Sequence, residues 1–405
     1  MHTSTLRFTS GLLLALAVTA CSGGEEPPPP PPPTQVQLTV VDAVDDGPIA
    51  GAFVYVAGSA GWTEVSADGV VTLEVDPGTH AYWVVAPMHV TVPPPLTEAP
   101  TVEAAANQTT EVRVTVDRRS VGAADGTIRG TVTVDGTPAE GVLVVAAGVP
   151  SYEGYSDATG AYVIVGVGNG SFQVRARQGG TAGDASQNVT TTAGQTSDGV
   201  DFALVAGGQD VTGTIGGGTG SGRVALLDPD VRRVVPGLSV SADLAAGYTI
   251  SGVPAGRYRL LGAFDADAYV MDPEPIRENG LPVVDVDAAA VTQDFDVAPA
   301  IDGLAPTGTA TATPALSWAP FADADYYVVD FRDAAGRTIW GGFDATGNWS
   351  TRTFDTSVMY GGPALSPGAR YTFRVFAAVQ DPIVPSVFAL VAASEAKGAS
   401  FRVAQ

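Results

Sequence analysis

The chain has 405 residues, of which 45% are apolar and 16% charged, and it contains 49 glycines and 30 prolines. This composition is typical of short strands joined by many turns, so we expect an all-β protein. Asp and Glu number 43 against 20 Lys and Arg, giving a net charge of −23. A field of this sign repels phosphate backbones and excludes nucleic acid as a partner. The single cysteine, Cys21, excludes an intrachain disulfide and Cys-rich metal motifs.

The amino terminus has the proportions of a secretory signal. A weakly basic start precedes an apolar run over residues 11–18, which is shorter than the ~20 apolar residues needed to span a bilayer. The tetrad Val18-Thr19-Ala20-Cys21 follows and resembles the bacterial lipobox. The resemblance implies that a signal peptide, residues 1–20, is removed and that Cys21 is lipidated, which would anchor the chain in a membrane. An ordinary signal peptide with a chance cysteine is the alternative.

The residues around the cysteine also suggest a location and a tether. Ser22 stands where an aspartate would indicate inner-membrane retention, so the lipobox resemblance points to the outer membrane of a diderm bacterium, with the protein periplasmic or surface-exposed. Residues 21–34 combine small, acidic and proline residues that cannot build a core. We expect them to form a spacer between the lipid and the first domain.

From Gln35 onward apolar and polar residues alternate along many short segments. Examples are "VQLTVV" at residues 36–41, "EVRVTV" at 111–116 and "FQVRAR" at 172–177. A period of two with one wet face is typical of antiparallel strands in a sandwich. The length of the chain allows several such domains.

An internal repeat divides this region. Three thirteen-residue segments align without gaps and start at Val70, Tyr162 and Tyr248, about 90 residues apart, which is close to one sandwich domain. Each has Val at its sixth place and Gly at its ninth, the glycines being Gly78, Gly170 and Gly256. We expect a hairpin turn with positive φ at this glycine and a strand on either side of it.

The repeated residues resemble the carboxypeptidase regulatory-like, transthyretin-like family. A Gly-x-Pro start precedes a β-branched run, a turn and a tyrosine-rich strand pair, and the second segment matches this pattern best. The first segment has Val70 and His80 in place of both tyrosines. The resemblance implies three small sandwiches at residues 35–119, 126–205 and 208–298, in a family grouped with carbohydrate-binding-like folds. It predicts tandem Ig-like or transthyretin-like β-sandwiches in an elongated array.

The last segment, residues 300–405, has a different pattern and resembles a fibronectin type III domain. Trp318 would be the core tryptophan of an early strand, and Tyr371 the tyrosine-corner residue that opens a late strand. Residues 399–404 would form the closing strand. The middle of this segment departs from the family pattern, which leaves its strand register open.

The residues offer little for catalysis or metal binding. Beyond residues 1–20 the histidines are His80 and His89, whose spacing fits no familiar metal site, so we expect packed strand histidines. Without another histidine a nucleophilic triad is almost unavailable, and we assign no catalytic residue and no cofactor. Several Asp-x-Asp pairs are expected to be solvated. Asp265 and Asp267 are the best of them as a weak candidate for Ca²⁺.

Aromatic residues in Gly/Ser/Asp-rich surroundings are the remaining lead. An exposed ring can stack on the C–H face of a sugar, whereas a partly buried ring merely closes a loop. The candidates are Trp62, Tyr152, Tyr155, Trp340 and Trp349.

Three functions follow from these patterns. The first is a non-catalytic cell-envelope lipoprotein that acts as a binding or adhesion module for a glycan or an envelope protein. The second is a structural spacer or accessory subunit of a surface complex. The third, which the residues favour least, is a polysaccharide or peptide hydrolase.

Overall fold

The computed structural model describes residues 31–405 apart from residues 98, 120–123, 125, 184, 265–267, 385–386 and 396–397 and the side chains of 278–279. Residues Pro33–Gln405 form one compact unit. The predicted signal peptide, Cys21 and the pair Asp265 and Asp267 lie outside the described residues. Among the described residues, no helix is long and apolar enough to cross a membrane.

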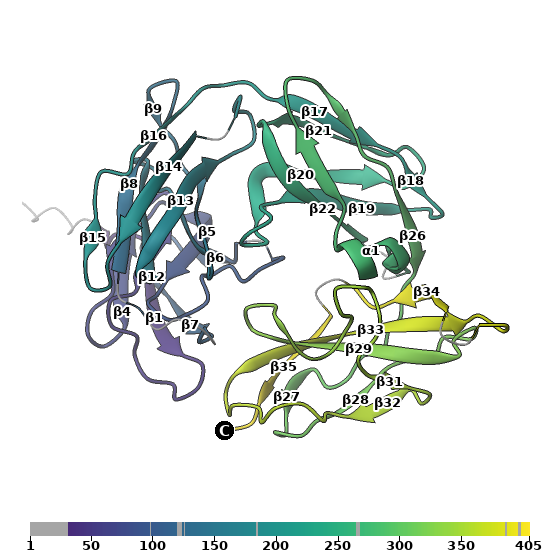
Figure 1. Cartoon of the computed structure of the whole chain (residues 1–405). Helices are drawn as coiled ribbons and strands as arrows, with labels where there is room; N and C mark the ends of the chain where they lie inside the picture. The colour runs from purple at the N-terminus through teal and green to yellow at the C-terminus, as the bar shows by residue number, and fades with distance from the viewer. Residues whose placement is uncertain are drawn as a thin grey trace, which may run out of the picture. The chain divides into compact units, whose positions relative to one another are not determined.

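The all-β prediction is confirmed, because strands make up nearly all the regular structure of the chain (Figure 1). Four sandwiches, here numbered 1 to 4, follow one another along the sequence. Each sheet takes its strands from one of the four ranges proposed above, to within one residue.

Sandwich 1 has a sheet of order β4-β1-β7 and a sheet of order β3-β2-β5-β6. The strands are β1 (Gln35–Asp42), β2 (Phe53–Val56), β3 (Thr63–Glu64), β4 (Val70–Glu74), β5 (Gly78–Val85), β6 (Thr101–Ala104) and β7 (Thr109–Val116). Along β1, Val36, Leu38 and Val40 are buried while Gln35 and Gln37 are half-buried, as the alternating sequence predicts.

Sandwich 2 pairs a sheet of order β11-β10-β13-β14 with one built around β8, which β12, β15, β16 and β9 join. The strands are β8 (Gly126–Val134), β9 (Thr137–Pro138), β10 (Leu143–Ala147), β11 (Tyr152–Tyr155), β12 (Ala161–Val167), β13 (Gly170–Arg177), β14 (Ala185–Thr191), β15 (Thr196–Ser197) and β16 (Phe202–Leu204).

Sandwich 3 has sheets of order β21-β17-β25, β18-β26-β23 and β20-β19-β22-β24. Its elements are β17 (Gln209–Gly213), β18 (Ile215–Gly216), β19 (Ser221–Leu227), β20 (Val234–Asp243), β21 (Tyr248–Val253), β22 (Gly256–Phe264), β23 (Tyr269–Met271), α1 (Pro273–Asn279), β24 (Val283–Val286), β25 (Val291–Thr292) and β26 (Phe295–Pro299).

Sandwich 4 has a main sheet of order β27-β35-β33-β29-β30, to which β31 and β34 add, and the pair β28-β32. The strands are β27 (Gly308–Ala310), β28 (Ala315–Ser317), β29 (Tyr326–Asp333), β30 (Thr338–Gly341), β31 (Arg352–Thr353), β32 (Ser357–Met359), β33 (Arg370–Gln380), β34 (Phe388–Ala393) and β35 (Ala399–Val403).

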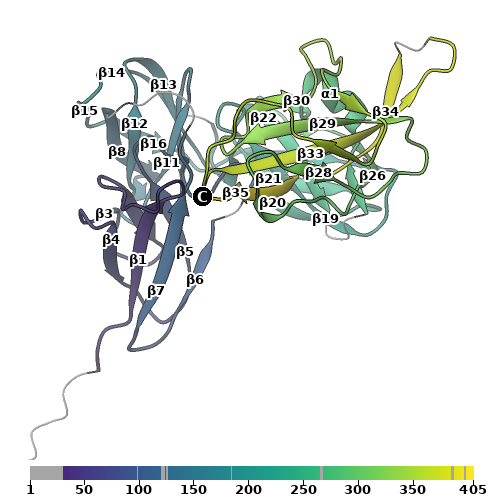
Figure 2. The same ribbon diagram turned by 90° about the horizontal axis from the view of Figure 1, so that it is seen from below.

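Each sandwich joins an early strand to a late one in parallel. Figure 2 shows β1 and β7 side by side, and β8 pairs in the same way with β15 and β16. The corresponding pairs are β17 with β25 and β18 with β26 in sandwich 3, and β27 with β35 in sandwich 4. The first and last strands therefore close each domain upon itself.

The glycine at the ninth position of each repeat segment does lie in a turn, but the predicted hairpin is wrong. Gly78, Gly170 and Gly256 have φ of 139°, 153° and 152°. The strands before and after each glycine nevertheless belong to different sheets: β4 pairs with β1 whereas β5 pairs with β2, and β12 pairs with β8 whereas β13 pairs with β10. The turn is an arch between the two layers, because the apolar residues on both strands face the core between them.

Sandwich 4 carries the two features expected from its resemblance. Trp318 is 5% exposed and belongs to the core, where its ring meets Tyr327 edge to face. The Tyr371 hydroxyl accepts a hydrogen bond from the Ser366 backbone N–H at 3.0 Å, which ties the strand β33 to the loop before it. The closing strand is β35, Ala399–Val403, as predicted to within one residue.

Two strands, β10 and β29, are buried on both faces, because neighbouring sandwiches pack on their outer sides. In β10, Val144 and Ala146 belong to the core of sandwich 2, while Leu143 and Val145 pack into the core cluster of sandwich 3. In β29, Val329 faces the core of sandwich 4 and Val328 packs with residues of sandwich 3. This double burial explains the unbroken apolar runs in both strands.

Sandwiches 1 and 4 are also in contact. Asp117, just after β7, accepts hydrogen bonds from Arg370 Nε at 3.1 Å and Arg402 Nη1 at 2.6 Å, and Gln405 Nε2 donates to the Val44 carbonyl at 3.0 Å. The sequence predicted an elongated array, in which the first and last domains would not touch. The contacts between sandwiches 1 and 4 differ from that prediction.

Candidate functional site

Two of the aromatic candidates, Trp62 and Tyr155, meet between sandwiches 1 and 2. Tyr152 and Tyr155, at the two ends of β11, are 3% and 5% exposed, which matches the buried alternative; the Tyr152 ring lies in the core of sandwich 2, whereas the Tyr155 ring packs outside it. Trp62 is partly buried, and its indole N–H donates to the Tyr155 carbonyl at 2.8 Å. Tyr55 and Trp83 complete the cluster, with ring centroids 5.6 Å apart. These rings hold two domains together rather than presenting a flat platform.

The other two candidates lie in sandwich 4. Trp340 packs against its core and meets Tyr360 edge to face at 5.3 Å. Trp349 packs at the edge of the cluster shared with sandwich 3, and the guanidinium of Arg352 lies 4.7 Å from its ring centroid. Both rings are partly buried, which matches the alternative that they close loops, and the structure does not bring them near Trp62.

Both histidines are packed against partners, as expected. The ring nitrogens of His80 lie 2.6 Å and 2.7 Å from the carbonyl oxygens of Ala57 and Asp76. His89 is 9% exposed and its Nε2 lies 2.9 Å from Asp42 Oδ2. Across the described part of the chain, no group of three or more His, Cys, Asp and Glu is placed to hold a metal ion.

Buried ion pairs join sandwiches 1, 2 and 3 at one junction. Glu153 of β11 is 5% exposed and binds Arg233 of sandwich 3 at 2.6 Å and Arg119, which follows sandwich 1, at 3.2 Å. Burial by itself would raise the pKa of Glu153, but the charges of Arg233 and Arg119 hold this pKa below its usual value.

A second junction joins sandwiches 2 and 3. Arg175 of β13 binds both carboxylate oxygens of Asp228, with its Nη2 2.8 Å from Oδ2, and Arg177 approaches the same oxygen at 3.1 Å. Asp228 is fully buried. The arginines of β13 thus lie on the outer face of sandwich 2. Solvent would cover this face if sandwich 3 were absent.

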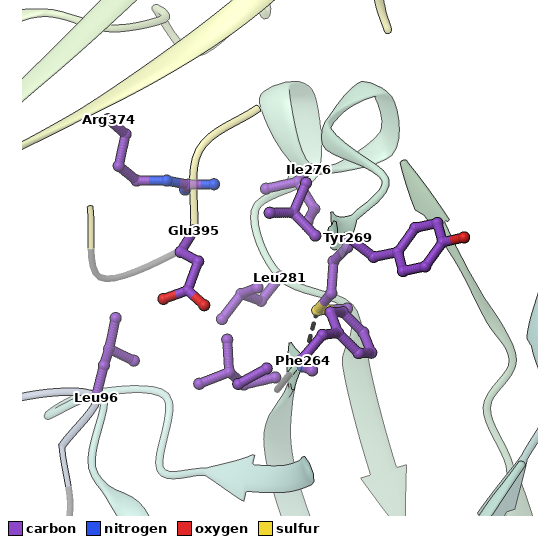
Figure 3. A pocket seen from close by; sticks show the side chains of 12 residues that line it. Leu96, Phe264, Tyr269, Ile276, Leu281, Arg374 and Glu395 are labelled. Atoms are coloured by element: carbon purple, nitrogen blue, oxygen red, sulfur yellow. Dashed lines mark hydrogen bonds between the residues drawn. The ribbon is translucent and has the colours of Figure 1, made fainter. Parts of the chain in front are cut away.

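Cavities lie between the domains. One of about 120 Å³ is lined by apolar residues of sandwich 3, among them Phe264, Ile276 and Leu281, together with Leu96 of sandwich 1 and Arg374 of sandwich 4 (Figure 3). Glu395 also lines it, and in Figure 3 its carboxylate points away from the Arg374 guanidinium. Three further cavities, of about 170, 180 and 280 Å³, are rich in arginine.

The sequence reasoning missed these arginines. One signal was present, because 19 of the 20 basic residues are Arg and a single one, Lys397, is Lys. Arginine keeps its charge when buried and binds carboxylates with two parallel hydrogen bonds, so a strong bias toward it favours paired or buried cations over a solvated surface.

Comparison with known proteins identifies one of the domains. Residues 127–205 match the carboxypeptidase regulatory-like domain. This is sandwich 2, whose residues carried the resemblance best. The match covers one domain, so membership of sandwiches 1 and 3 stays a prediction. No curated protein sequence matches the chain.

Several solved structures are similar to the chain at low identity. The Bacillus anthracis TIE protein is 10% identical with a TM-score of 0.18, over 66% of this chain and 51% of its own, so the chain spans about half of that protein. A streptococcal ancillary pilin is 11% identical with a TM-score of 0.19, over 65% and 98%. Chicken CNTN1 FN1-FN3 domains are 10% identical with a TM-score of 0.17, over 67% and 91%. Likenesses this low say nothing of ligand or partner.

Proposed function

We propose that the protein is a non-catalytic binding module of the bacterial cell envelope, anchored through a lipid on Cys21. One observation carries the non-catalytic part. Five carboxylates line the described cavities, and four of them, Glu153, Asp230, Asp330 and Asp333, each bind an arginine. Carboxylates engaged in ion pairs with arginine suit structure and electrostatics better than acid–base catalysis, which needs a carboxylate within reach of the substrate proton.

A binding screen tests this function. Residues 33–405, which contain all the described strands, would be immobilised and exposed to a broad panel of glycans and to solubilised envelope proteins. We expect selective retention of one class of partner and no turnover of polysaccharide or peptide substrates. Silence across both panels would count against a binding module, and turnover that one carboxylate change abolishes would establish an enzyme.

Anchoring has a separate test. Cys21→Ala should release the protein from the membrane fraction or leave the precursor uncut, since the sulfur that accepts the lipid is gone. Mass spectrometry of the amino-terminal peptide should find the lipid in the unchanged protein. Unchanged membrane partition, with no lipid on that peptide, would refute the anchor without bearing on binding.

The dense packing between domains favours a second function, a rigid spacer or accessory subunit. Shared cores join sandwich 2 to 3 and sandwich 3 to 4, and ion pairs join 1 to 4. Such contacts oppose the relative motion expected of loosely linked domains. Crosslinking in intact cells should then capture one dominant partner, and recovery of the uncrosslinked chain alone would contradict this function.

A further inference from the structure

Arg232 and Arg233 are adjacent in the turn between β19 and β20, but their side chains have different surroundings. Arg233 is 2% exposed and well bonded, with a carboxylate oxygen of Glu153 at 2.6 Å, the Thr91 carbonyl at 3.2 Å and the Pro93 carbonyl as partners. Arg232 turns toward sandwich 4, where its Nη1 makes a long contact of 3.4 Å with the Gly336 carbonyl. Its backbone has a φ of 56°, an unfavourable conformation for a long side chain.

The outer face of sandwich 4 supplies two more arginines at the same place. Asp330 of β29 lies opposite Arg374 of β33, and Arg332 lies two residues along on the same face as Asp330. Arg332 Nε donates to Asp330 Oδ2 at 2.7 Å. Arg374 is 8% exposed, its nearest hydrogen bond is 3.4 Å to the Ser394 carbonyl, and its Nε has no partner among the described residues.

These three arginines line one cavity of about 170 Å³, together with Asp330. Arg277 lines it as well but binds Glu274 at 2.6 Å. Arg232 and Arg332 also line the adjoining cavity of about 280 Å³. Among the described side chains that line the cavity, three guanidinium groups face a single carboxylate, which leaves two of these positive charges without a counter-charge there.

This arrangement is costly and unlike the other buried arginines of the chain. Arg175 and Arg233 each have a buried carboxylate as partner. Burial together with the charge of Arg332 lowers the pKa of Arg374 to about 9 and that of Arg232 to about 10. A protein with a net charge of −23 has many carboxylates that could pair with these arginines, so the excess of positive charge among the described lining residues favours an anionic ligand.

We propose that the cavity between sandwiches 3 and 4 binds an oxyanion through Arg232, Arg332 and Arg374. Guanidinium groups bind phosphate, sulfate and carboxylate groups with paired hydrogen bonds. A buried water needs ~10–15 Å³ of cavity, so about 170 Å³ accepts an inorganic oxyanion or the acidic group of a sugar. This inference rests on the proposed function in that it names a ligand class for the binding module.

Calorimetric titration of residues 33–405 with sodium phosphate, sodium sulfate and D-glucuronate tests the site, with ionic strength held constant by chloride. We expect saturable binding of about one equivalent of at least one probe. Arg232→Gly and Arg374→Leu should each weaken it tenfold or more. The exposed Arg257, paired with Asp285, provides the control Arg257→Leu, which should leave binding unchanged. Tight glucuronate binding would assign the site to acidic sugars, and tight phosphate or sulfate binding to a free ion.

Thermal melts without added oxyanion give an independent readout. Both cavity variants should melt higher than the unchanged protein, because each removes an uncompensated buried charge and Arg232→Gly also relieves the positive φ. Their midpoints should then rise less with phosphate. The oxyanion site would be overturned if no probe bound saturably, or if both variants bound the probe as tightly as the unchanged protein does. If the glycan and protein screen succeeds while these titrations fail, the proposed function stands and the oxyanion site does not.

Discussion

Among single residues, Glu153 connects the largest number of domains. Its buried carboxylate binds Arg233 of sandwich 3 and Arg119 from the segment after sandwich 1. Glu153→Gln would leave two guanidinium groups without their negative partner in a nearly dry site. We expect the free energy of unfolding in urea to fall by about 3–5 kcal/mol. Asp285→Asn, which breaks an exposed pair with Arg257, should cost much less, and equal losses would contradict a structural role for the junction.

Two buried carboxylates give the stability of the protein a defined dependence on acid. Burial would raise the pKa of Asp42, but hydrogen bonds from Arg118 and His89 hold it below 3.8, and arginines likewise hold the pKa of Glu153 below 4.5. Their contribution is complete above pH 4.5. It is lost as pH falls below that value, since the unfolded chain then binds more protons. Unfolding free energies measured from pH 6 to 3 should decline, less steeply for Glu153→Gln. An unchanged slope would contradict the assignment.

The sequence predicted that both histidines pack against partners and that Trp318 lies in a core. It did not predict the buried ion pairs. A histidine at a strand position has few alternatives to packing, and a core tryptophan follows from the alternation around it. Arg233 and Glu153 are 80 residues apart, in different domains, and nothing in their local sequence shows that they meet. The surroundings of an aromatic candidate are hidden for a related reason: Tyr155 lies in a polar stretch, yet its ring is covered by another domain.

At the scale of the strands, a tyrosine packed on a glycine of the neighbouring strand explains the tyrosine that opens the second and third repeat segments. Tyr162 of β12 lies opposite Gly130 of β8, and its hydroxyl donates to the Val200 carbonyl at 2.6 Å. Tyr248 and Gly213 form the same pair in sandwich 3, where the hydroxyl donates to the Gln293 carbonyl. The ring covers the glycine and reaches the chain beside the late parallel strand. In sandwich 1 both partners change together, since Val70 lies opposite Thr39.

The glycine of this pair should tolerate no side chain. A Cβ at Gly130 would lie 1.9 Å from the Val200 carbonyl oxygen and 3.0 Å from the Tyr162 ring. We expect Gly130→Ala to lower the free energy of unfolding by at least about 3 kcal/mol, because the late strand would have to move. Gly183→Ala is the control, since its Cβ would find Ala255 at 3.8 Å. Similar stability of the two variants in urea denaturation would show that the sheet yields easily at Gly130.

The strands of the repeat could be predicted from their period, but their partners could not. Alternation assigns residues to an inner and an outer face without saying which sheet a strand joins. A glycine with positive φ suits a hairpin and an arch equally well. The arch at Gly170 becomes evident only when β12 and β13 are placed in separate layers.

At the scale of the whole molecule, contacts between domains determine how the sandwiches pack and whether they unfold together. The alternating segments of the sequence predicted β-sandwich structure throughout this region, and that fold class is confirmed. It did not predict that sandwich 1 meets sandwich 4, since Asp117, Arg370 and Arg402 look like ordinary surface residues until their faces are brought together. Unbroken apolar runs such as that of β10 were the available sign that outer faces are covered as well.

The shared cores predict that sandwiches 3 and 4 unfold together. Val328 and Val329 are adjacent in β29, with 0% and 1% exposure, but Val328 packs toward sandwich 3 and Val329 into the core of sandwich 4. Scanning calorimetry of residues 33–405 should show one transition whose calorimetric and van't Hoff enthalpies agree. Val328→Asp should split it into two, because a charge in the interface separates domains that keep their own cores. Val329→Asp should instead abolish the folding of sandwich 4. Separate transitions in the unchanged protein would show that the domains fold independently.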